Sequence, residues 1–525
     1  MLDAVVANFI DTVGEREFDA PFMALLRARG YYDIHFLHGQ FEFGKDFIAK
    51  RVGDDGTLRQ YVFQSKAGDL NLGQWTRGLG QIEMLRRNQI AHPSFDATLP
   101  RKAVFTLTGR LVGGAAPEAQ DYCRQCIERG ETLLEIWDRE RLIEFVRATI
   151  NVGLAERTEG PLLGIVAAAD AMTATDQQIE EVTRRWCDAG QEAWPCVLEA
   201  AIIAARLQKH RRVDLSAVTG LAMLRAACFQ MHGSEPPDSK WLVAADLARR
   251  IFATHAKQLW DRMPAGGPDP ATMITKHGDA AALVTVAVRC VRLAELVGLL
   301  GLMDPLEGLE TPSADAVGAW ISRFLLRAPP AASPISDHWA TSIIPPVLLL
   351  VKSGRTDRAA DHLRDLVLWV SQRYGKGIGL ADANVKPIIE VRQVIGNVVP
   401  PNNLARRSQS LLAATVLDLT AFLRLDRLYA LARNEFRRVN ALPQVVVVDD
   451  SIDQYILDSI NVSVEVNAPY RDAIEGEWTS VTPHLREAAR PRYLERIGRP
   501  WDHLAVSAVV RDRYFVASWN DLIAV

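Results

Sequence analysis

The sequence predicts an α/β domain over residues 1–150, with a mixed sheet flanked by helices, followed by a mainly α-helical region. Two observations indicate this division. Segments with helical and strand-like spacing alternate over the first 150 residues, whereas helical spacing dominates from residue 176 onward. In addition, hydrophobic residues make up 48% of the 525-residue chain, which is enough to form a large core and argues against global disorder.

The N-terminal elements follow one another in the order αβββαβαβα. The first helix is expected over Glu15–Arg29 and is closed by Gly30. Strand-like runs follow at Tyr32–Leu37, Asp46–Val52 and Gln60–Lys66, and the last two are separated by the hairpin signal Gly53–Gly56. The remaining segments are expected to be helix, strand, helix, strand and helix, in this order: Leu72–Arg87, Ala103–Leu107, Pro117–Arg129, Thr132–Trp137 and Arg139–Val146. Such an order suits a mixed sheet with helices on its faces.

Residues 151–175 have the composition of a linker, and residues 176–525 are expected to form a mainly helical region that could divide into two subdomains. No fixed repeat period is found there, which argues against a regular solenoid. Short strands are expected at Val445–Val448 and Val462–Val466. Helices are expected at Leu198–Leu207, Leu215–Gln230, Lys240–Trp260, Ala280–Leu302, Ser313–Leu326, Arg358–Arg373 and Gln409–Phe436.

Composition excludes several classes of protein. The net charge of −4 excludes a globally basic nucleic-acid binder but leaves room for a local basic groove. The six cysteines are sparse and irregularly spaced, so no disulfide framework is expected, and Cys123-x-x-Cys126 lacks the partner pair of a zinc site. The N-terminus lacks the basic start of a signal peptide, and charges or prolines interrupt the apolar tracts. We therefore expect a cytoplasmic protein with no membrane contact.

One pattern in the α/β domain carries chemistry. Asp46 precedes an apolar strand, and after the hairpin turn the next strand ends in Gln64-Ser65-Lys66. Residues at positions i and i+2 of a strand share a face, so Gln64 and Lys66 point the same way. Oxygen ligands can hold a hard cation such as Mg²⁺, and a nearby lysine can stabilise charge during phosphodiester hydrolysis. The spacing alone is a weak signal.

The surrounding residues make the signal more specific, because they resemble the Mrr-like restriction endonucleases of the PD-(D/E)xK nuclease superfamily. Gly44-x-Asp46 resembles that family's Gly-x-Asp, and Gln64-x-Lys66 resembles its Gln-x-Lys variant of (D/E)xK. The resemblance covers residues 15–148 and includes, in the same order, Phe18-Asp19, Phe22, Leu25-Leu26, Gly30-Tyr31, Val104–Gly109, Ala119 and Leu133–Leu142. It implies a restriction-endonuclease-like fold for this domain only.

The resemblance also implies roles for individual residues. Asp46 would be the principal metal ligand, Gln64 a ligand or a residue that positions water, and Lys66 the group that stabilises charge and orients the attacking water. Asp19 stands where the family commonly carries a helix-borne Glu, and Glu17 is an alternative for that position. Asp19 has a shorter side chain than that Glu. Gln81, one helix later, is a weaker candidate for supporting the site or contacting DNA. The implied cofactor is Mg²⁺ or Mn²⁺.

The function implied is a metal-dependent DNA endonuclease in restriction or anti-phage defence, which the helical region gates or targets. The expected partners are DNA, further copies of the chain in a homodimer or higher oligomer, and a partner protein of the same defence system. Two alternatives stay open: a nuclease fold that binds nucleic acid without cutting it, and a helical scaffold whose effector role depends on a partner. The sequence leaves open whether the substrate is DNA or RNA, modified or plain.

Overall fold

The computed structural model describes residues 2–37, 47–53, 55–87, 90, 92–151, 159–188, 190–232, 238–264, 281–380, 409–443, 499–511 and 514–524. The chain divides into two compact units. The first unit comprises Met1–Met223, Ser239–Thr254 and Pro305–Glu310; the second comprises Leu224–Asp238, His255–Asp304 and Thr311–Val525. No helix within the described ranges is both long enough and apolar enough to cross a membrane.

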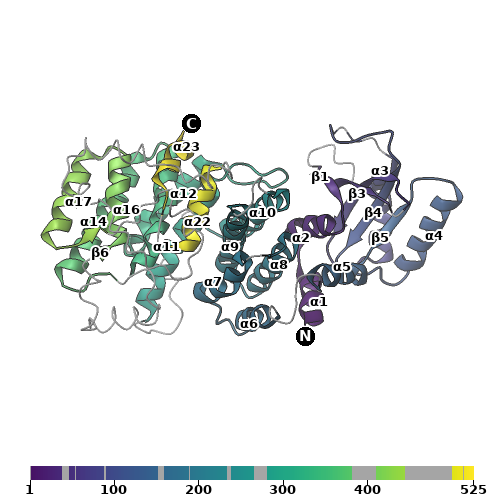
Figure 1. Ribbon diagram of the computed structural model, residues 1–525, viewed down its shortest axis with the longest axis horizontal. Coiled ribbons are helices and arrows are strands. Elements are labelled where there is room, and N and C mark those ends of the chain that lie inside the picture. Colours follow the sequence, from purple (N-terminus) through teal and green to yellow (C-terminus); the bar gives the residue numbers. More distant parts are fainter. Residues whose placement is uncertain are drawn as a thin grey trace. The chain divides into compact units, whose positions relative to one another are not determined.

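A five-stranded mixed sheet is the centre of the α/β part of the first unit (Figure 1). Its spatial order is β1-β2-β3-β4-β5; the β1–β2 and β2–β3 pairs are antiparallel, and the β3–β4 and β4–β5 pairs are parallel. The strands are β1 (Tyr32–Phe36), β2 (Phe47–Val52), β3 (Leu58–Lys66), β4 (Arg101–Leu107) and β5 (Leu134–Trp137). The expected mixed sheet with flanking helices is therefore confirmed.

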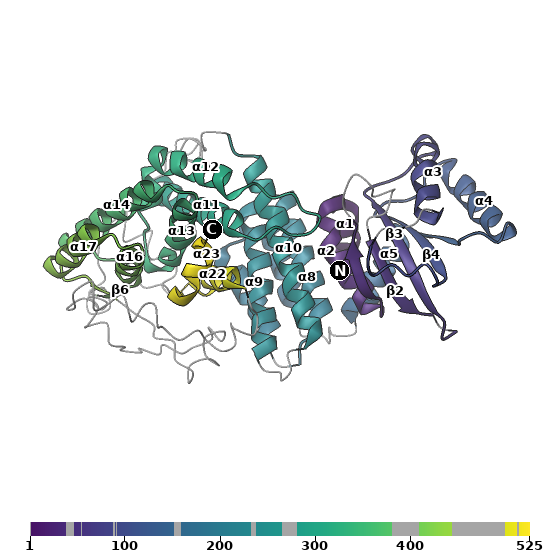
Figure 2. The same cartoon turned by 90° about the horizontal axis from the view of Figure 1, so that it is seen from above.

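Helices cover both faces of this sheet (Figure 2). One face packs on α3 (Leu72–Arg87) and α4 (Ala115–Glu128) through a core that includes Val62, Phe105 and Trp75. The other face is aromatic, and its rings contact α2 and α5. The ring centroids of Phe22 (α2) and Phe63 lie 5.6 Å apart, and those of Trp137 and Phe145 (α5) lie 5.0 Å apart. The helices on this side are α1 (Leu2–Thr12), α2 (Glu15–Ala28) and α5 (Arg139–Asn151). Sequence patterning identified all of these elements except α1.

The first unit continues past the sheet into helices. Part of the segment 151–175, which the sequence suggests is a linker, forms helix α6. Helix α8 packs against α1, α2, α5 and α6. At Gly220, an added Cβ would lie only 2.5 Å from the backbone nitrogen of Phe252, so this glycine lets α9 and α10 cross closely. The helices that begin in this unit are α6 (Glu159–Asp170), α7 (Asp176–Arg184), α8 (Ala193–Lys209), α9 (Val213–His232) and α10 (Ser239–Asp261), with a 3-10 turn at Arg185–Cys187. The residues of α9 after Met223 and of α10 after Thr254 belong to the second unit.

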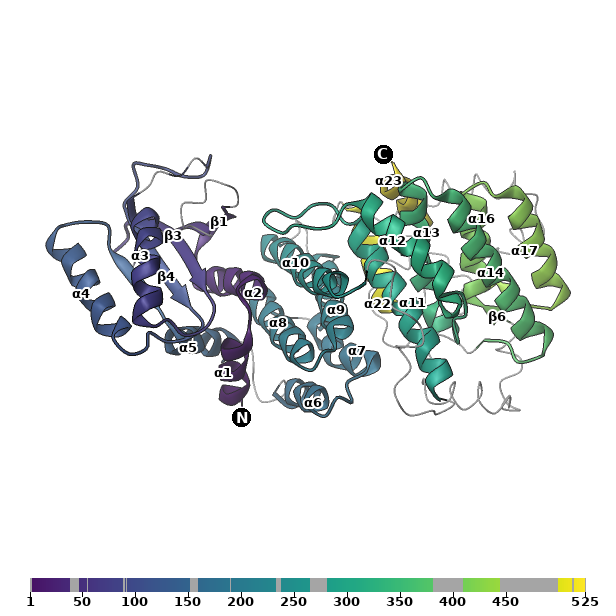
Figure 3. The same ribbon diagram turned by 180° about the vertical axis from the view of Figure 1, so that it is seen from behind.

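The second unit is mainly helical in its described residues (Figure 3). Its helices are α11 (Ala281–Leu302), α12 (Ala314–Arg327), α13 (Ile344–Lys352), α14 (Thr356–Gly375), α16 (Leu411–Phe422), α17 (Asp426–Arg438), α22 (Pro500–Val510) and α23 (Trp519–Ile523). Short 3-10 turns lie at Pro329–Ala332, Asp337–Trp339, Thr341–Ile343 and Val516–Ser518, and β6 (Gln409–Ser410) pairs with β7 (Leu442–Pro443).

Two sequence expectations for this unit need comment. The single helix expected over Gln409–Phe436 is wrong, because Arg424 adopts a φ of 55° and separates α16 from α17. A left-handed residue that is not glycine leaves no mark in the apolar spacing, so the pattern could not reveal this break. The strands expected at Val445–Val448 and Val462–Val466 lie outside the described residues.

Candidate active site

The candidate site lies at the carboxyl end of β3, the central strand of the sheet. β3 pairs with antiparallel β2 on one side and with parallel β4 on the other, and its last residues, Gln64 and Lys66, are in register with Phe105 and Leu107 of β4. Val62, two residues before Gln64, belongs to the core beneath α3 and α4. Strand alternation therefore directs Gln64 to the α3/α4 face and starts the Lys66 side chain on that same face. Their functional groups have different neighbours, because Gln64 bonds to Gln81 of α3 whereas the Lys66 ammonium lies near Glu15 of α2, on the other side of the sheet.

Gln64 is buried, with only 2% of its surface exposed. Its Nε2 donates a hydrogen bond to Oε1 of Gln81 on α3, over 3.0 Å, whereas its Oε1 has no hydrogen-bond partner among the described residues. Leaving a buried polar group unsatisfied costs about 1–3 kcal/mol. The structure thus holds an amide oxygen with free lone pairs in place, and Gln81 fixes the orientation of that amide.

Lys66 is the last residue of β3 and is 35% exposed in its side chain. Its Nζ lies 3.6 Å from Oε1 of Glu15, the first residue of α2. Sequence reasoning overlooked Glu15. A usable signal was present, since Glu15 and Asp19 are one helical turn apart and Asp19 had been singled out. Glu15 adds a carboxylate beside the lysine at the strand end.

The two acids expected on this helix have other neighbours. Glu17 accepts hydrogen bonds with both carboxylate oxygens: from the backbone N–H of Gly14 over 2.9 Å and from Nε2 of Gln208 over 2.8 Å. It therefore caps α2 and ties α2 to α8. Asp19 is 7% exposed and faces Arg250 of α10. Burial lowers the pKa of Arg250, and the negative charge of Asp19 acts against that shift.

Asp46 lies outside the described residues. The described part of β2 begins at the next residue, Phe47, which is in register with Phe63 on β3 and with Phe36 on β1. Gln64 follows Phe63 directly. The role expected for Asp46 stays a prediction.

The turn after β3 is held against the end of β4. The backbone N–H of Gly68 donates to Oγ1 of Thr108 over 2.9 Å. A Cβ at Gly109 would lie 2.2 Å from the carbonyl carbon of Gly68, so the two backbones approach as closely as glycine allows. Three residues after Gly68, Asn71 and Gln74 cap the start of α3 reciprocally. These contacts hold in place the turn that joins the end of β3, which carries Lys66, to the start of α3, which carries Gln81.

The oxygen donors at this strand end suit a hard cation in type. Amide and carboxylate oxygens are the ligands that Mg²⁺ takes in proteins. Gln64 offers the amide oxygen beside α3, and Glu15 offers a carboxylate at the start of α2, on the other side of the strand end. Within the described parts of the chain, no three His, Cys, Asp or Glu side chains are grouped closely enough to hold a metal ion. A complete metal centre would therefore require Asp46 as well.

The cysteine pair at Cys123 and Cys126 is not organised as a metal site. All six cysteines of the chain are free thiols, and Cys126 is buried in α4. The Cys123 thiol donates to the backbone oxygen of Leu134 over 3.6 Å, and burial raises the pKa of both thiols. Raised pKa values favour the neutral thiol, whereas a metal ligand must be a thiolate.

Comparison of the chain with protein-family models, with curated proteins and with solved structures gives no match. The functional argument therefore rests on the sequence motif and the geometry of this strand end.

Proposed function

We propose that the α/β part of the first unit is a metal-dependent endonuclease of the restriction-endonuclease-like class, which hydrolyses phosphodiester bonds in DNA. The observation that carries this proposal is the buried Oε1 of Gln64, which has no partner among the described residues and lies two residues before Lys66. An unpartnered buried oxygen is costly, and a bound cation would relieve that cost.

Each residue of the site has a chemical role in this proposal. Asp46 and Gln64 would hold Mg²⁺ or Mn²⁺, and Glu15 would supply a further oxygen. Such a cation, when bound, lowers the pKa of its water and neutralises charge on the phosphate. Lys66 donates hydrogen bonds from its ammonium group, orienting the attacking water and stabilising the extra negative charge of the transition state. Glu15, 3.6 Å away, keeps the lysine directed toward the strand end.

The helical remainder of the chain would gate or target the cutting activity, in restriction or anti-phage defence. Support comes from contacts that join the helices to the sheet part within the first unit. Gln208 and Arg206 of α8 bind Glu17 and Asn8, respectively, and Arg250 of α10 lies 4.1 Å from the Phe36 ring at the end of β1. A double-strand cut by a single-site domain would suit a two-fold dimer.

Cleavage of plasmid and phage DNA with Mg²⁺ or Mn²⁺ tests the proposal. We expect the intact chain to nick or linearise DNA, and Asp46→Ala and Lys66→Ala each to lower the rate by at least about 100-fold. Lys102→Ala is the matched control, because Lys102 lies at the opposite end of the sheet and pairs with Glu135 over 2.8 Å.

Other outcomes separate the alternatives. If the intact chain shifts DNA in a gel but never cuts it with either metal, the nuclease proposal is wrong and the fold is a binding module. Activity that appears only after addition of a second protein supports a partner-dependent effector. Cleavage that survives in both Asp46→Ala and Lys66→Ala would place the active site elsewhere.

A further inference from the structure

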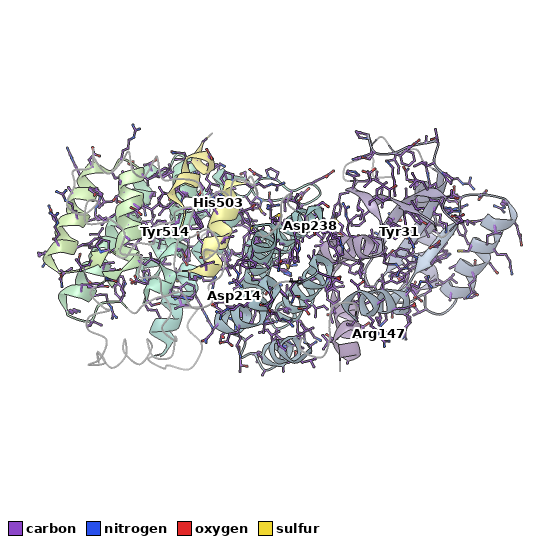
Figure 4. All side chains as sticks on the ribbon, viewed as in Figure 1. Tyr31, Arg147, Asp214, Asp238, His503 and Tyr514 are labelled. Carbon is purple, nitrogen blue, oxygen red and sulfur yellow. The ribbon has the colours of Figure 1, made fainter. Side chains whose placement is uncertain are left out.

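A separate cavity of about 370 Å³ opens in the first unit, where the ends of α2, β2 and α5 meet the start of α8. Its volume falls in the range of small-molecule sites. Figure 4 labels two residues next to lining residues: Tyr31, whose ring centroid lies 5.3 Å from the Arg51 guanidinium, and Arg147, which precedes Ala148 in the chain. The antiparallel register puts Arg51 beside Arg59, near the start of β3, whereas Lys66 ends that strand. The cavity is therefore distinct from the candidate active site.

Two arginines give the cavity a positive character. Arg29, at the end of α2, stacks its guanidinium 3.7 Å from the Phe145 ring, and its Nε is buried with no hydrogen-bond partner among the described residues. Burial lowers the pKa of Arg29; Tyr31 acts against this shift, as does Glu144, whereas the positive charges of Arg51 and Arg141 add to it. Arg29 and Arg51 repel each other across the cavity, and an anion bound between them would remove that repulsion.

The start of α8 supplies the opposite wall. Glu192 is the N-cap residue, and its side chain does not cap the helix, so the first turn lacks the usual side-chain acceptor. The N-terminus of a 17-residue helix carries partial positive charge and favours anions. Trp194, in the first turn, is half-buried and lines the cavity. An indole face is a good stacking surface for a flat aromatic ring.

Glu192 narrows the choice of ligand, because it is the acid in the lining. A carboxylate accepts hydrogen bonds from hydroxyl or amino groups, which a simple phosphate ion at neutral pH does not offer in sufficient number. The lining thus combines two guanidinium donors, one carboxylate acceptor and one aromatic surface. These features fit a ligand with an anionic group, hydroxyl or amino donors and a flat ring.

We propose that this cavity binds a mononucleotide, with its phosphate between Arg29 and Arg51 and its base against Trp194. Glu192 accepts hydrogen bonds from the sugar hydroxyls or from an amino group of the base. The proposal does not depend on nuclease activity at the carboxyl end of β3. Because α8 also contacts α1, α2 and α5, the occupied cavity would fasten the helical part of the unit to the sheet part.

Isothermal titration of the full chain with AMP, GMP, CMP, UMP, inorganic phosphate and adenosine tests this proposal. We expect at least one nucleotide to saturate one site per chain, about 10-fold or more tightly than phosphate or adenosine. Arg51→Gln and Trp194→Leu should each weaken that binding about 10-fold.

Glu192→Gln, which changes an exposed residue, should strengthen the binding of inorganic phosphate a few-fold, because it removes a negative charge that repels phosphate. Misfolding could not produce a tightening. Arg124→Gln, an exposed arginine of α4 that pairs with Asp121, is the control and should change nothing.

Three results would overturn the proposal: no binding of any nucleotide to the folded chain, nucleotide binding that Arg51→Gln and Trp194→Leu both leave intact, or phosphate binding as tightly as every nucleotide. The last result would remove the role assigned to Trp194.

Discussion

Glu295 in the second unit and Gln64 in the first are both buried polar side chains, yet their surroundings differ. Glu295 is fully buried, and both of its oxygens are bonded: Oε1 accepts from Ser342 at 2.9 Å and from Arg511 at 2.7 Å, and Oε2 accepts from Arg511 at 2.9 Å and from Arg292 at 3.0 Å. Gln64 keeps one oxygen unbonded. A buried group whose bonds are all made within the chain stabilises the fold, whereas one left unbonded has capacity for a ligand.

The largest effect should come from removing the carboxylate of Glu295, to which Ser342, Arg292 and Arg511 are bonded. Glu295→Ala leaves Arg292 and Arg511 buried without their carboxylate, while both guanidiniums stay 4.9 Å from the Trp339 ring. Removing one partner of a buried ion pair costs about 3–5 kcal/mol, so we expect a large drop in the free energy of unfolding. Chemical denaturation measures it. A loss no larger than that of exposed Glu128→Ala would contradict the structural role of Glu295.

A second buried group makes stability depend on pH. Burial, helped by the charge of Arg358, lowers the pKa of His362 in α14 to about 4, so the folded chain keeps this imidazole neutral. Below about pH 6.5 the unfolded chain binds a proton that the folded chain does not, and stability falls as the pH drops toward 4. The loss approaches roughly 3 kcal/mol, at about 1.4 kcal/mol per pH unit.

Denaturation at pH 7.5 and at pH 4.5 checks this dependence. His362→Asn should lose less stability between these two values than the wild-type chain does. Arg358→Gln should also narrow the difference, because it removes a charge that disfavours protonation of His362. Equal losses in wild type and His362→Asn would show that other groups control the acid sensitivity.

Gln64→Leu tests the other residue of the comparison, whose amide oxygen is unbonded. Leucine removes the unsatisfied oxygen and keeps most of the volume, so we expect the unfolding free energy to be unchanged or to rise by about 1 kcal/mol. DNA cleavage should fall about 100-fold, because a ligand to the metal is lost. Stability and activity thus move in opposite directions. A variant that loses both would indicate that Gln64 is only a structural residue.

The smallest effect distinguishes two neighbouring acids of α2. Glu15→Gln should lower cleavage about 10-fold and raise the Mg²⁺ concentration needed for half-maximal rate, with little change in stability. Glu17→Gln should instead cost about 0.5–1 kcal/mol of stability, because the amide has one acceptor oxygen for the two donors Gly14 and Gln208, and it should leave the Mg²⁺ requirement as it was. Measuring the cleavage rate as a function of Mg²⁺ concentration, together with thermal unfolding, tests both expectations. An unchanged Mg²⁺ requirement in Glu15→Gln would remove Glu15 from the proposed site.

Most of the α/β part could be predicted, because its spacing is regular and its turn residues are marked. α3 begins at Leu72 and ends at Arg87 as expected, and β3 ends at Lys66 as expected. Helices α1, α6, α7, α13, α22 and α23 were not anticipated; they are short or lie in segments whose composition resembles a linker or contains proline. In such segments tertiary packing stabilises the helix, and local spacing carries little information.

By itself the sequence determined the alternation that puts Gln64 and Lys66 on one face, since a strand's period of two is a property of the backbone. It also determined the absence of a disulfide framework. Only the tertiary structure decided that Gln64 donates to Gln81 and keeps its oxygen unbonded, that Glu15 lies beside Lys66, and that Gln208 donates to Glu17. These facts depend on contacts between residues far apart in the chain, and such contacts are fixed by how the helices pack on the sheet and on one another.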